Sequence, residues 1–342
     1  MNMIPALLMI FLQFISVGNN VFNKLALDSG MNPQILVAYR QIFATCFLAP
    51  TVFFERKTRP TFTKLIFFKI FLSAFFGGVM HQCLYFTGLK HTTPTIACAL
   101  LNTAPAITFI LAIFFRMEAI GIQKNWGKAK VIGTIVCVGG AVIMSFYKGS
   151  IINIGRSTLH WQYAEKLISK QTSASSTVAG PIVVFFGVVC FSMWFIIQNN
   201  LFKTFPAPYT STTLMFAMAS VLCVLLAVIQ DRSGEAWSMK SFIRIGTCLY
   251  SGAFASALAF VVTAWCISKR GPLYVSMFGP IALVMVAFFD WALLDGEIYV
   301  GSVVGSVSIA IGLYAVLWGK GQEMKESYDI PINFDAQNSP HS

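Results

Sequence analysis

Charged residues are scarce in this sequence. They make up 11% of its 342 residues, whereas hydrophobic residues make up 56%. The mean hydropathy of +0.72 lies far from the balance of a soluble domain, so the composition excludes a soluble fold and indicates an integral membrane protein. The net charge of +11 comes from short Lys and Arg clusters between apolar runs. That distribution excludes a nucleic-acid partner and fits the positive-inside rule.

The sequence also lacks the usual motifs of enzymes and metal sites. It contains no Gly-rich phosphate loop with a following lysine, no G-x-S-x-G and no paired Cys/His motif. All eight cysteines lie in apolar segments without close-spaced partners, so we interpret them as small core residues. We therefore expect no catalytic residue, no metal site and no cofactor.

Ten apolar runs are present, each long enough to cross the hydrocarbon core, which takes about 20 helical residues. The expected spans are 4–26, 34–54, 65–88, 94–115, 129–147, 179–201, 210–230, 243–267, 273–294 and 298–318. These runs are continuous rather than alternating, which excludes a β-barrel. The expected fold class is an all-α, multi-pass protein with ten transmembrane helices in a lipid bilayer.

Lys and Arg are concentrated on one side of the predicted bundle, mainly in the loops 55–64 and 116–130. The positive-inside rule then places both termini in the cytoplasm. The tail, residues 320–342, is polar and weakly acidic, so we expect it to be disordered.

Two stretches separated by about half the chain resemble each other. Residues 104–115 and 279–289 each begin an apolar run with a proline and close it on Phe-Phe. In the run that follows each of them, Gly133 corresponds to Gly305 and Gly140 to Gly312. These matches predict two five-helix halves. Because five is odd, the second half enters the membrane from the opposite side, an inverted repeat typical of secondary transporters.

This repeat predicts a division of the chain into four parts. They are a first repeat (1–147), an extracytoplasmic connecting loop (148–178), a second repeat (179–319) and the cytoplasmic tail (320–342).

Pro105 and Pro280 stand at related places in the apolar runs of the two halves. A proline in a lipid-buried helix leaves a carbonyl without its partner, which is costly unless protein or cavity water satisfies it. We therefore expect both prolines to face the interior as kink or gating positions. Asn102, one turn before Pro105, is predicted to line a solvated pathway; the alternative is that it bonds to a neighbouring helix.

The first run carries a polar stripe at helical spacing: Gln13, Ser16, Asn20 and Lys24. Four polar groups on one face either line a pathway or contact another helix, and we favour the lining. We place Gln13 and Asn20 among the substrate-binding residues.

Other polar side chains in the spans complete the candidate site. Gln82, Tyr85, Trp194, Gln198 and Thr263 join Gln13, Asn20 and Asn102 as candidate substrate-binding residues. His81, Arg40 and Asp290 are further intramembrane polar residues without an assigned role. His81 could relay protons, but a structural role is the simpler interpretation. Thr263 shares a small-residue face with Gly252, Ser256 and Ala259, a pattern that more often packs against a helix.

Several long stretches resemble one plant family. These are KLALDSGMNPQILVAYRQIFATCFLAPTVFFERKTRP, LYFTGLKHTTPTIACALLNTAPAITFILAIFFRME, KVIGTIVCVGGAVIMSFYKG and GPLYVSMFGPIALVMVAFFDWALLDGEIYVGSVVGS. They are similar to the Walls-Are-Thin-related, nodulin-like transporters of the EamA branch of the drug/metabolite transporter superfamily. The resemblance extends from the first span to Lys320 and covers Lys24, Tyr39, Arg40, Gln82, Pro105 and Pro280.

This resemblance implies two inverted EamA repeats of five helices around a central cavity. It also implies movement of amino acids, with auxin and related organic acids as substrates of some members, in the plasma membrane or the vacuolar membrane. We therefore expect a facilitator of amino acids or similar small amphoteric metabolites that alternates access. The alternatives are an auxin or organic-acid carrier and, from another class, a non-transporting receptor or scaffold. The sequence does not indicate an oligomeric state.

Overall fold

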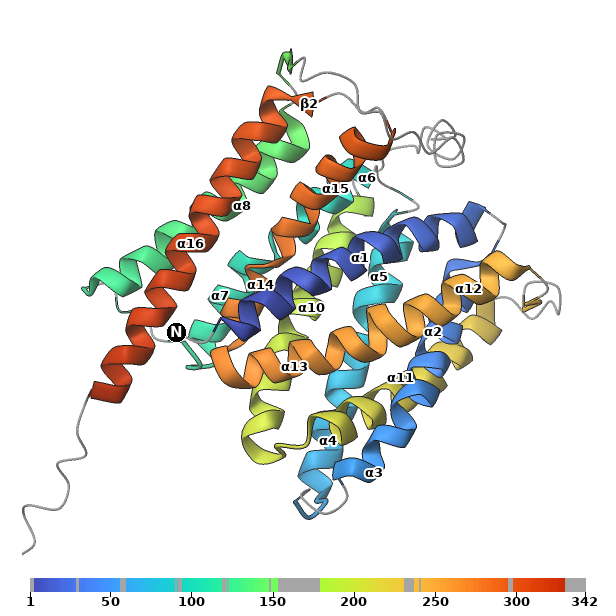
Figure 1. Ribbon diagram of the computed structural model, residues 1–342. Coiled ribbons are helices and arrows are strands. Elements are labelled where there is room, and N and C mark those ends of the chain that lie inside the picture. The colour runs from blue at the N-terminus through green and yellow to red at the C-terminus, as the bar shows by residue number, and fades with distance from the viewer. Residues whose placement is uncertain are drawn as a thin grey trace, which may run out of the picture.

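The computed structural model describes residues 3–28, 31–55, 60–89, 91, 94–118, 121, 123–147, 149–152, 179–230, 237–239, 241–294 and 298–329. These residues form a bundle of helices (Figure 1), which confirms the all-α class and the ten expected spans. Six of the described helical stretches are long and apolar enough to cross a membrane by themselves. Shorter apolar helices account for further crossings.

The first half contains five spans. They are α1 (Ile4–Asp28); α2 (Pro33–Leu48) followed by η1 (Ala49–Thr51) and α3 (Val52–Glu55); α4 (Lys64–Ser73), η2 (Ala74–Met80) and α5 (His81–Leu89); α6 (Pro94–Leu101) and α7 (Ala104–Phe114); and α8 (Asn125–Phe146).

The second half repeats this order. Its spans are α10 (Ala179–Thr204); α11 (Pro208–Gln230); α12 (Phe242–Tyr250), η3 (Ser251–Leu258) and α13 (Ala259–Arg270); α14 (Pro272–Ser276) and α15 (Gly279–Leu294); and α16 (Val300–Asp329). Two short strands, β1 (Ile151–Ile152) and β2 (Ile298–Tyr299), pair antiparallel at the ends of α8 and α16.

The two halves share the same irregularities, which strengthens the repeat seen in the sequence. The third span of each half contains a π-helical segment, η2 or η3, between two α-helices. The fourth span of each half is broken just before a proline, between α6 and α7 and between α14 and α15. π-Segments and broken helices are frequent at functional sites of membrane proteins. Both halves therefore place such features in the middle of the bundle.

Helices α8 and α16 lie side by side along one edge of the bundle (Figure 1). Their glycines allow this close approach: a Cβ at Gly133 would lie 2.7 Å from the carbonyl oxygen of Gly312, and one at Gly140 would lie 2.9 Å from that of Gly305. Small residues let transmembrane backbones pack in this way. The glycines that correspond in sequence thus contact crosswise, as expected for antiparallel helices in equivalent positions of inverted halves.

One sequence-based expectation is wrong: the tail is not disordered from residue 320, because α16 continues to Asp329. Ion pairs hold this extension. Lys320 Nζ lies 2.5 Å from Glu118 Oε2 and 3.0 Å from Glu323 Oε2, and Glu323 also lies 3.1 Å from Lys130 Nζ. The polar composition of the extension therefore reflects these contacts, while residues 330–342 lie outside the described part of the chain.

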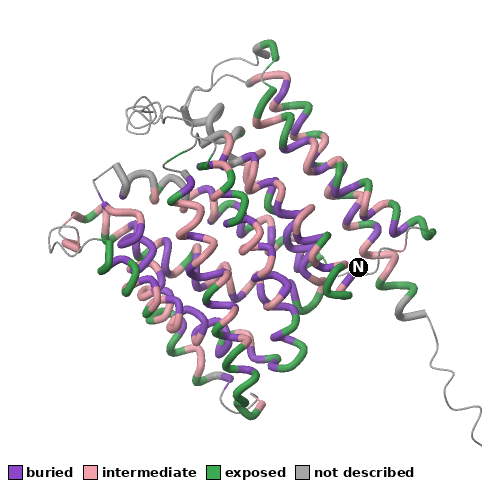
Figure 2. Tube along the Cα trace, turned by 180° about the vertical axis from the view of Figure 1, so that it is seen from behind, coloured by how far each residue is buried: buried purple, intermediate pink, exposed green. Residues whose placement is uncertain are grey.

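Burial follows the position of each helix in the bundle (Figure 2). Buried side chains concentrate where α2, α10, α11 and α13 meet, and large apolar side chains such as Phe114 (78% exposed) and Phe242 (87% exposed) point outward. Exposed apolar side chains of this kind suit contact with lipid chains. Cys46 departs from the expectation of core cysteines, because it is exposed on α2.

Candidate functional site

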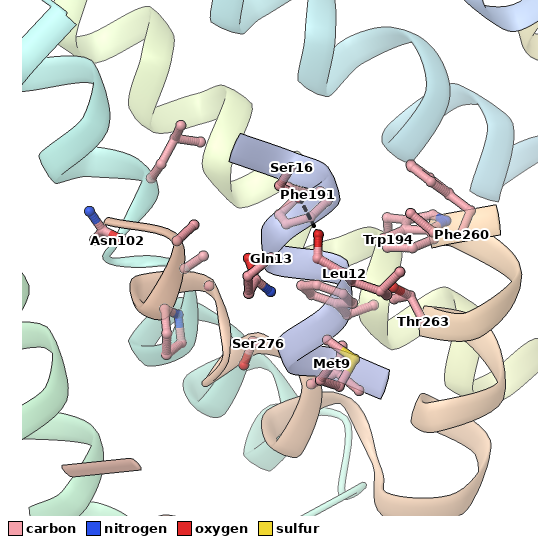
Figure 3. A pocket seen from close by; sticks show the side chains of 18 of the residues that line it. Met9, Leu12, Gln13, Ser16, Asn102, Phe191, Trp194, Phe260, Thr263 and Ser276 are labelled. Carbon is pink, nitrogen blue, oxygen red and sulfur yellow. Dashed lines mark hydrogen bonds between the residues drawn. The ribbon is translucent and has the colours of Figure 1, made fainter. Parts of the chain in front are cut away.

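A cavity of about 360 Å³ lies in the middle of the bundle, where segments of both halves meet. Its walls come from α1, the start of α5, the α6–α7 break, α10, the η3–α13 junction and the α14–α15 break (Figure 3). The volume falls in the range of small-molecule sites, roughly 300–1,000 Å³. It can hold a small metabolite.

Polar side chains lie at several places around this cavity. Gln13 and Ser16 project from α1, Asn102 from the α6–α7 break, Thr263 from α13 and Ser276 from the end of α14. The Ser16 hydroxyl donates to the Leu12 carbonyl at 3.0 Å. Gln13 is 8% exposed, so its amide is almost fully removed from the surface. The sequence-based candidates Gln13, Asn102 and Thr263 thus border the same cavity, from α1, the α6–α7 break and α13.

Aromatic side chains form another part of the lining. Trp194 is 1% exposed, and its ring centroid lies 4.7 Å from that of Phe260 and 5.7 Å from that of Phe191. Such distances are typical of stabilising aromatic pairs. All three rings border the cavity, so a bound molecule would meet apolar or π surface as well as amides and hydroxyls.

His81 also borders the cavity, at the first position of α5. Its Nδ1 lies 3.0 Å from the carbonyl oxygen of Gly187, and its ring stacks on Phe191 with centroids 4.5 Å apart. A hydrogen bond to a carbonyl requires the proton on Nδ1, which leaves Nε2 as an acceptor. The structural interpretation of His81 therefore fits these contacts, while a proton-relay role stays a hypothesis.

Gly77 in η2 makes room for Trp194. A Cβ at Gly77 would lie 2.4 Å from Cδ1 and 2.5 Å from Cγ of the indole. We expect Gly77→Ala to destabilise the protein by about 1–3 kcal/mol, because the packed indole has to move. Gly246→Ala on α12 is the matched control, since no atom lies within 4 Å of its added Cβ. Melting temperatures of the purified proteins in detergent test this; equal values for the two variants would contradict it.

Pro105 and Pro280 occupy the helix starts that follow the two breaks. Pro105 is in the first turn of α7 and Pro280 in the first turn of α15, where the missing proline N–H would have no intrahelical partner in any case. Pro105 borders the cavity, whereas Pro280 is buried next to Gly279, which borders it. The prolines therefore begin new helices instead of bending continuous ones, a geometry that a proline in sequence alone does not distinguish from a kink.

Three predicted binding residues lie outside the cavity lining: Gln82, Tyr85 and Gln198. Gln198 is 2% exposed and accepts a hydrogen bond from the Ser73 hydroxyl at 3.1 Å. Gln82 is 5% exposed, and within the described residues its Oε1 has no hydrogen-bond partner. Tyr85 packs against Phe86, with ring centroids 5.5 Å apart. Their role in binding stays a prediction.

Arg40 lies on α2, where its Nε donates to the Ser256 hydroxyl at 2.6 Å. The side chains of Asn20 and Asp290 are outside the described residues, so the predicted lining role of Asn20 and a contact between Arg40 and Asp290 stay untested. The residue before Asn20, Asn19, is described, and its Oδ1 accepts a hydrogen bond from the Ser251 hydroxyl at 2.7 Å. Part of the polar face of α1 therefore contacts η3.

The two parts of the small-residue face of the eighth span have different neighbours. A Cβ at Gly252 would lie 2.5 Å from Phe43 Cβ and 3.2 Å from the Arg40 carbonyl oxygen, so this end of the face packs tightly against α2. Ala259 and Thr263, further along, border the cavity. The packing interpretation thus describes the first part of the face.

Sequence reasoning missed several lining residues, notably Phe191, Phe260 and Ser276. Phe191 stands three positions before Trp194 and so shares its helical face, which is a usable signal. Ser276 and Phe260 carry no comparable signal, because many serines and phenylalanines occur in these spans.

Two similar helical halves that enclose a cavity at broken helices define a class of proteins, the membrane transporters built from repeats. The chain belongs to the EamA-like transporter family and is WAT1-related: the sequence profile of this family matches residues 3–146 and 178–318. This is a family of transporters and not of enzymes.

Curated relatives are similar over nearly the full chain. WAT1-related protein At4g01440 of Arabidopsis thaliana is 35% identical over 97% of this chain and 91% of its own length. WAT1-related protein At1g68170 of the same plant is 38% identical over 93% of this chain and 90% of its length. A crystal structure with a TM-score of 0.65 covers 92% of this chain and 98% of its own, at 13% identity. That likeness supports the fold alone. The family resemblance expected from the sequence is confirmed.

Proposed function

We propose that this EamA-like transporter is an alternating-access facilitator of amino acids or similar small amphoteric metabolites, and that the central cavity is its binding site. The observation that carries the proposal is the cavity itself. It lies mid-bundle at the helix breaks of both halves, and among the described residues that border it none carries a carboxylate, an ammonium or a guanidinium group.

The chemistry of the cavity suits such a substrate. Its amides and hydroxyls can hydrogen-bond a polar head group without the desolvation cost of an ionised side chain. The rings of Phe191, Trp194 and Phe260 can hold an apolar side chain, or an ammonium group through cation–π attraction. The absence of a carboxylate in this described lining argues for facilitated movement over coupling through a protonatable acid.

Alternating access would come from the two inverted halves. We propose that residues 1–147 and 179–319 exchange conformations around the cavity, with residues 148–178 as an extracytoplasmic loop and 320–342 as a cytoplasmic tail. Both termini would face the cytoplasm, in the plasma membrane or the vacuolar membrane. The matching π-segments and helix breaks support this proposal, since equivalent irregular elements can adopt each other's conformations.

An auxin or organic-acid carrier is the second candidate, favoured by the aromatic wall around Trp194. A planar aromatic acid would stack there while its polar end meets Gln13 and Asn102. A non-transporting receptor or scaffold would need no route through the protein.

Flux in reconstituted vesicles tests these functions. We expect saturable uptake of at least one labelled amino acid or of indole-3-acetic acid, at two pH values and without an imposed proton gradient. A panel of amino acids and the auxin separates the first two candidates. Flux equal to that of protein-free vesicles for every compound would support the scaffold and overturn the proposal.

A cavity-filling variant tests the route. Ala282 borders the cavity, whereas Ala310 is exposed on α16. We expect Ala282→Trp to abolish the flux and Ala310→Trp, the matched control, to preserve it. Undiminished flux through Ala282→Trp would show that the substrate does not cross this cavity.

A further inference from the structure

At the two helix breaks, the carbonyl end of the preceding helix and the amino end of the following helix differ in their hydrogen bonding. At the end of α6, the Leu100 carbonyl accepts hydrogen bonds from the Thr103 amide at 3.0 Å and the Thr103 hydroxyl at 2.6 Å. At the end of α14, the Leu273 carbonyl accepts from the Met277 amide at 3.2 Å and the Ser276 hydroxyl at 2.9 Å. The negative, carbonyl ends of the short helices are therefore occupied within the protein.

The amino ends of the following helices are not capped in this way. Thr103 makes no side-chain hydrogen bond to the start of α7, and Phe278, which precedes α15, has no side-chain oxygen. Among the described residues, the Gly279 amide at the start of α15 donates no hydrogen bond outside the helices. Gly279 borders the cavity, and no atom lies within 4 Å of a Cβ placed on it. Open amides at a helix start attract anions.

Gln13 is the second, independent feature at this place. Figure 3 shows its amide directed from α1 into the cavity, on the side where Ser276 lies. The side chain is 8% exposed and, within the described structure, makes no hydrogen bond. A bound group that accepts a hydrogen bond from Gln13 Nε2 would supply the partner that the described side chains do not.

The surroundings favour a negative over a positive ligand group here. No carboxylate borders the cavity in the described part of the chain. Arg40, on α2, donates to the Ser256 hydroxyl and makes no ion pair with any described carboxylate. The helix start therefore contributes positive potential to a cavity whose described lining has no carboxylate.

We propose that the cavity recognises its substrate through a carboxylate group, held by the open amide of Gly279 at the start of α15 and by the Gln13 amide. This rests on the proposed function, which it deepens by naming the group that amino acids and indole-3-acetic acid share. The remainder of the substrate, apolar or with an ammonium group, then lies toward Phe191, Trp194 and Phe260. A substrate without a carboxylate is bound weakly.

Matched acid and amide ligands test this site. The probes are L-phenylalanine with L-phenylalaninamide and indole-3-acetate with indole-3-acetamide, titrated onto the purified full chain in lipid nanodiscs. We expect at least one acid to bind about tenfold or more tightly than its amide, because hydrogen bonds to a charged group are the stronger ones. Equal affinity of acids and amides, or no binding of either acid, overturns the carboxylate site.

Variants at Gln13 sharpen the test. Gln13→Glu places a negative charge at the site with little change of shape, so it should lower acid affinity at least about tenfold and remove the preference over the amide. Gln13→Leu, which adds no charge, should lower acid affinity less. Gln34→Leu is the matched control, because Gln34 is also 8% exposed but lies outside the cavity lining. Unchanged acid affinity in Gln13→Glu, with a monodisperse protein, overturns the assignment.

The two proposals fail separately. If vesicles transport amides as well as acids, the facilitator stands and the carboxylate site is wrong. If acids bind selectively but nothing crosses the vesicle membrane, the site stands and the transport proposal is wrong.

Discussion

Replacing Gly312 with leucine is expected to destabilise the protein by at least about 3 kcal/mol, the upper end of the usual cost of overpacking. A Cβ at Gly312 would lie 2.5 Å from the Cys137 backbone nitrogen and 2.6 Å from the Gly133 carbonyl oxygen. These are backbone atoms of α8, so they cannot turn aside as a side chain would. The whole α8–α16 pair would have to separate.

Gly139→Leu supplies the control for this experiment. Gly139 lies on α8 as well, but no atom is within 4 Å of its added Cβ, and leucine is a better helix former than glycine. The fraction of protein that stays monodisperse after heating, followed by size-exclusion chromatography, gives the comparison. Equal melting of the Gly312→Leu and Gly139→Leu proteins would mean that the close helix contact contributes little to stability.

Removing the buried positive charge of Lys130 is expected to cause the second large loss of stability. Its side chain is 0% exposed, and its Nζ lies 3.3 Å from Glu118 Oε2 and 3.1 Å from Glu323 Oε2. Lys130→Met keeps an unbranched side chain but leaves Glu118, also 0% exposed, with less compensation. Breaking a buried pair on one side costs about 3–5 kcal/mol. Lys320, at 2.5 Å from Glu118, remains, so we expect a loss near the lower value.

Lys124→Met is the matched control. Lys124 also pairs with a glutamate, Glu326, at 2.5 Å, but its side chain is 58% exposed, and exposed pairs contribute about 0–1 kcal/mol. The double variant Glu118→Gln, Lys130→Met should recover much of the loss, since it removes the stranded charge. Equal melting temperatures of the Lys130→Met and Lys124→Met proteins would show that the buried cluster does not stabilise the fold.

The sequence-based prediction of site residues relied on polar side chains, and one tryptophan, that stand within apolar runs. Gln13, Asn102 and Trp194 are conspicuous for that reason, and all three border the cavity. Gln82 and Gln198 are equally conspicuous but lie outside its lining. Periodicity says that a polar residue in a span must face protein; it does not say whether a cavity or another helix lies there.

The buried cluster of charged side chains shows a second limit of prediction from local sequence. Glu118, Lys130, Lys320 and Glu323 are spread over more than half the chain, and the last two stand in a segment whose composition predicts disorder. Their order comes from partners that are distant in sequence, and local composition contains no information about such partners.

The sequence by itself determined the membrane environment, the ten spans, the repeat and the family, because apolar run length, charge distribution and matched motifs are local properties of the chain. Only the tertiary structure decided that the prolines begin new helices at two breaks, that glycines of α8 and α16 contact crosswise, and which polar side chains share one cavity. The physical reason is that each of these features depends on the position of one helix relative to another. That position is set by packing between residues far apart in the chain.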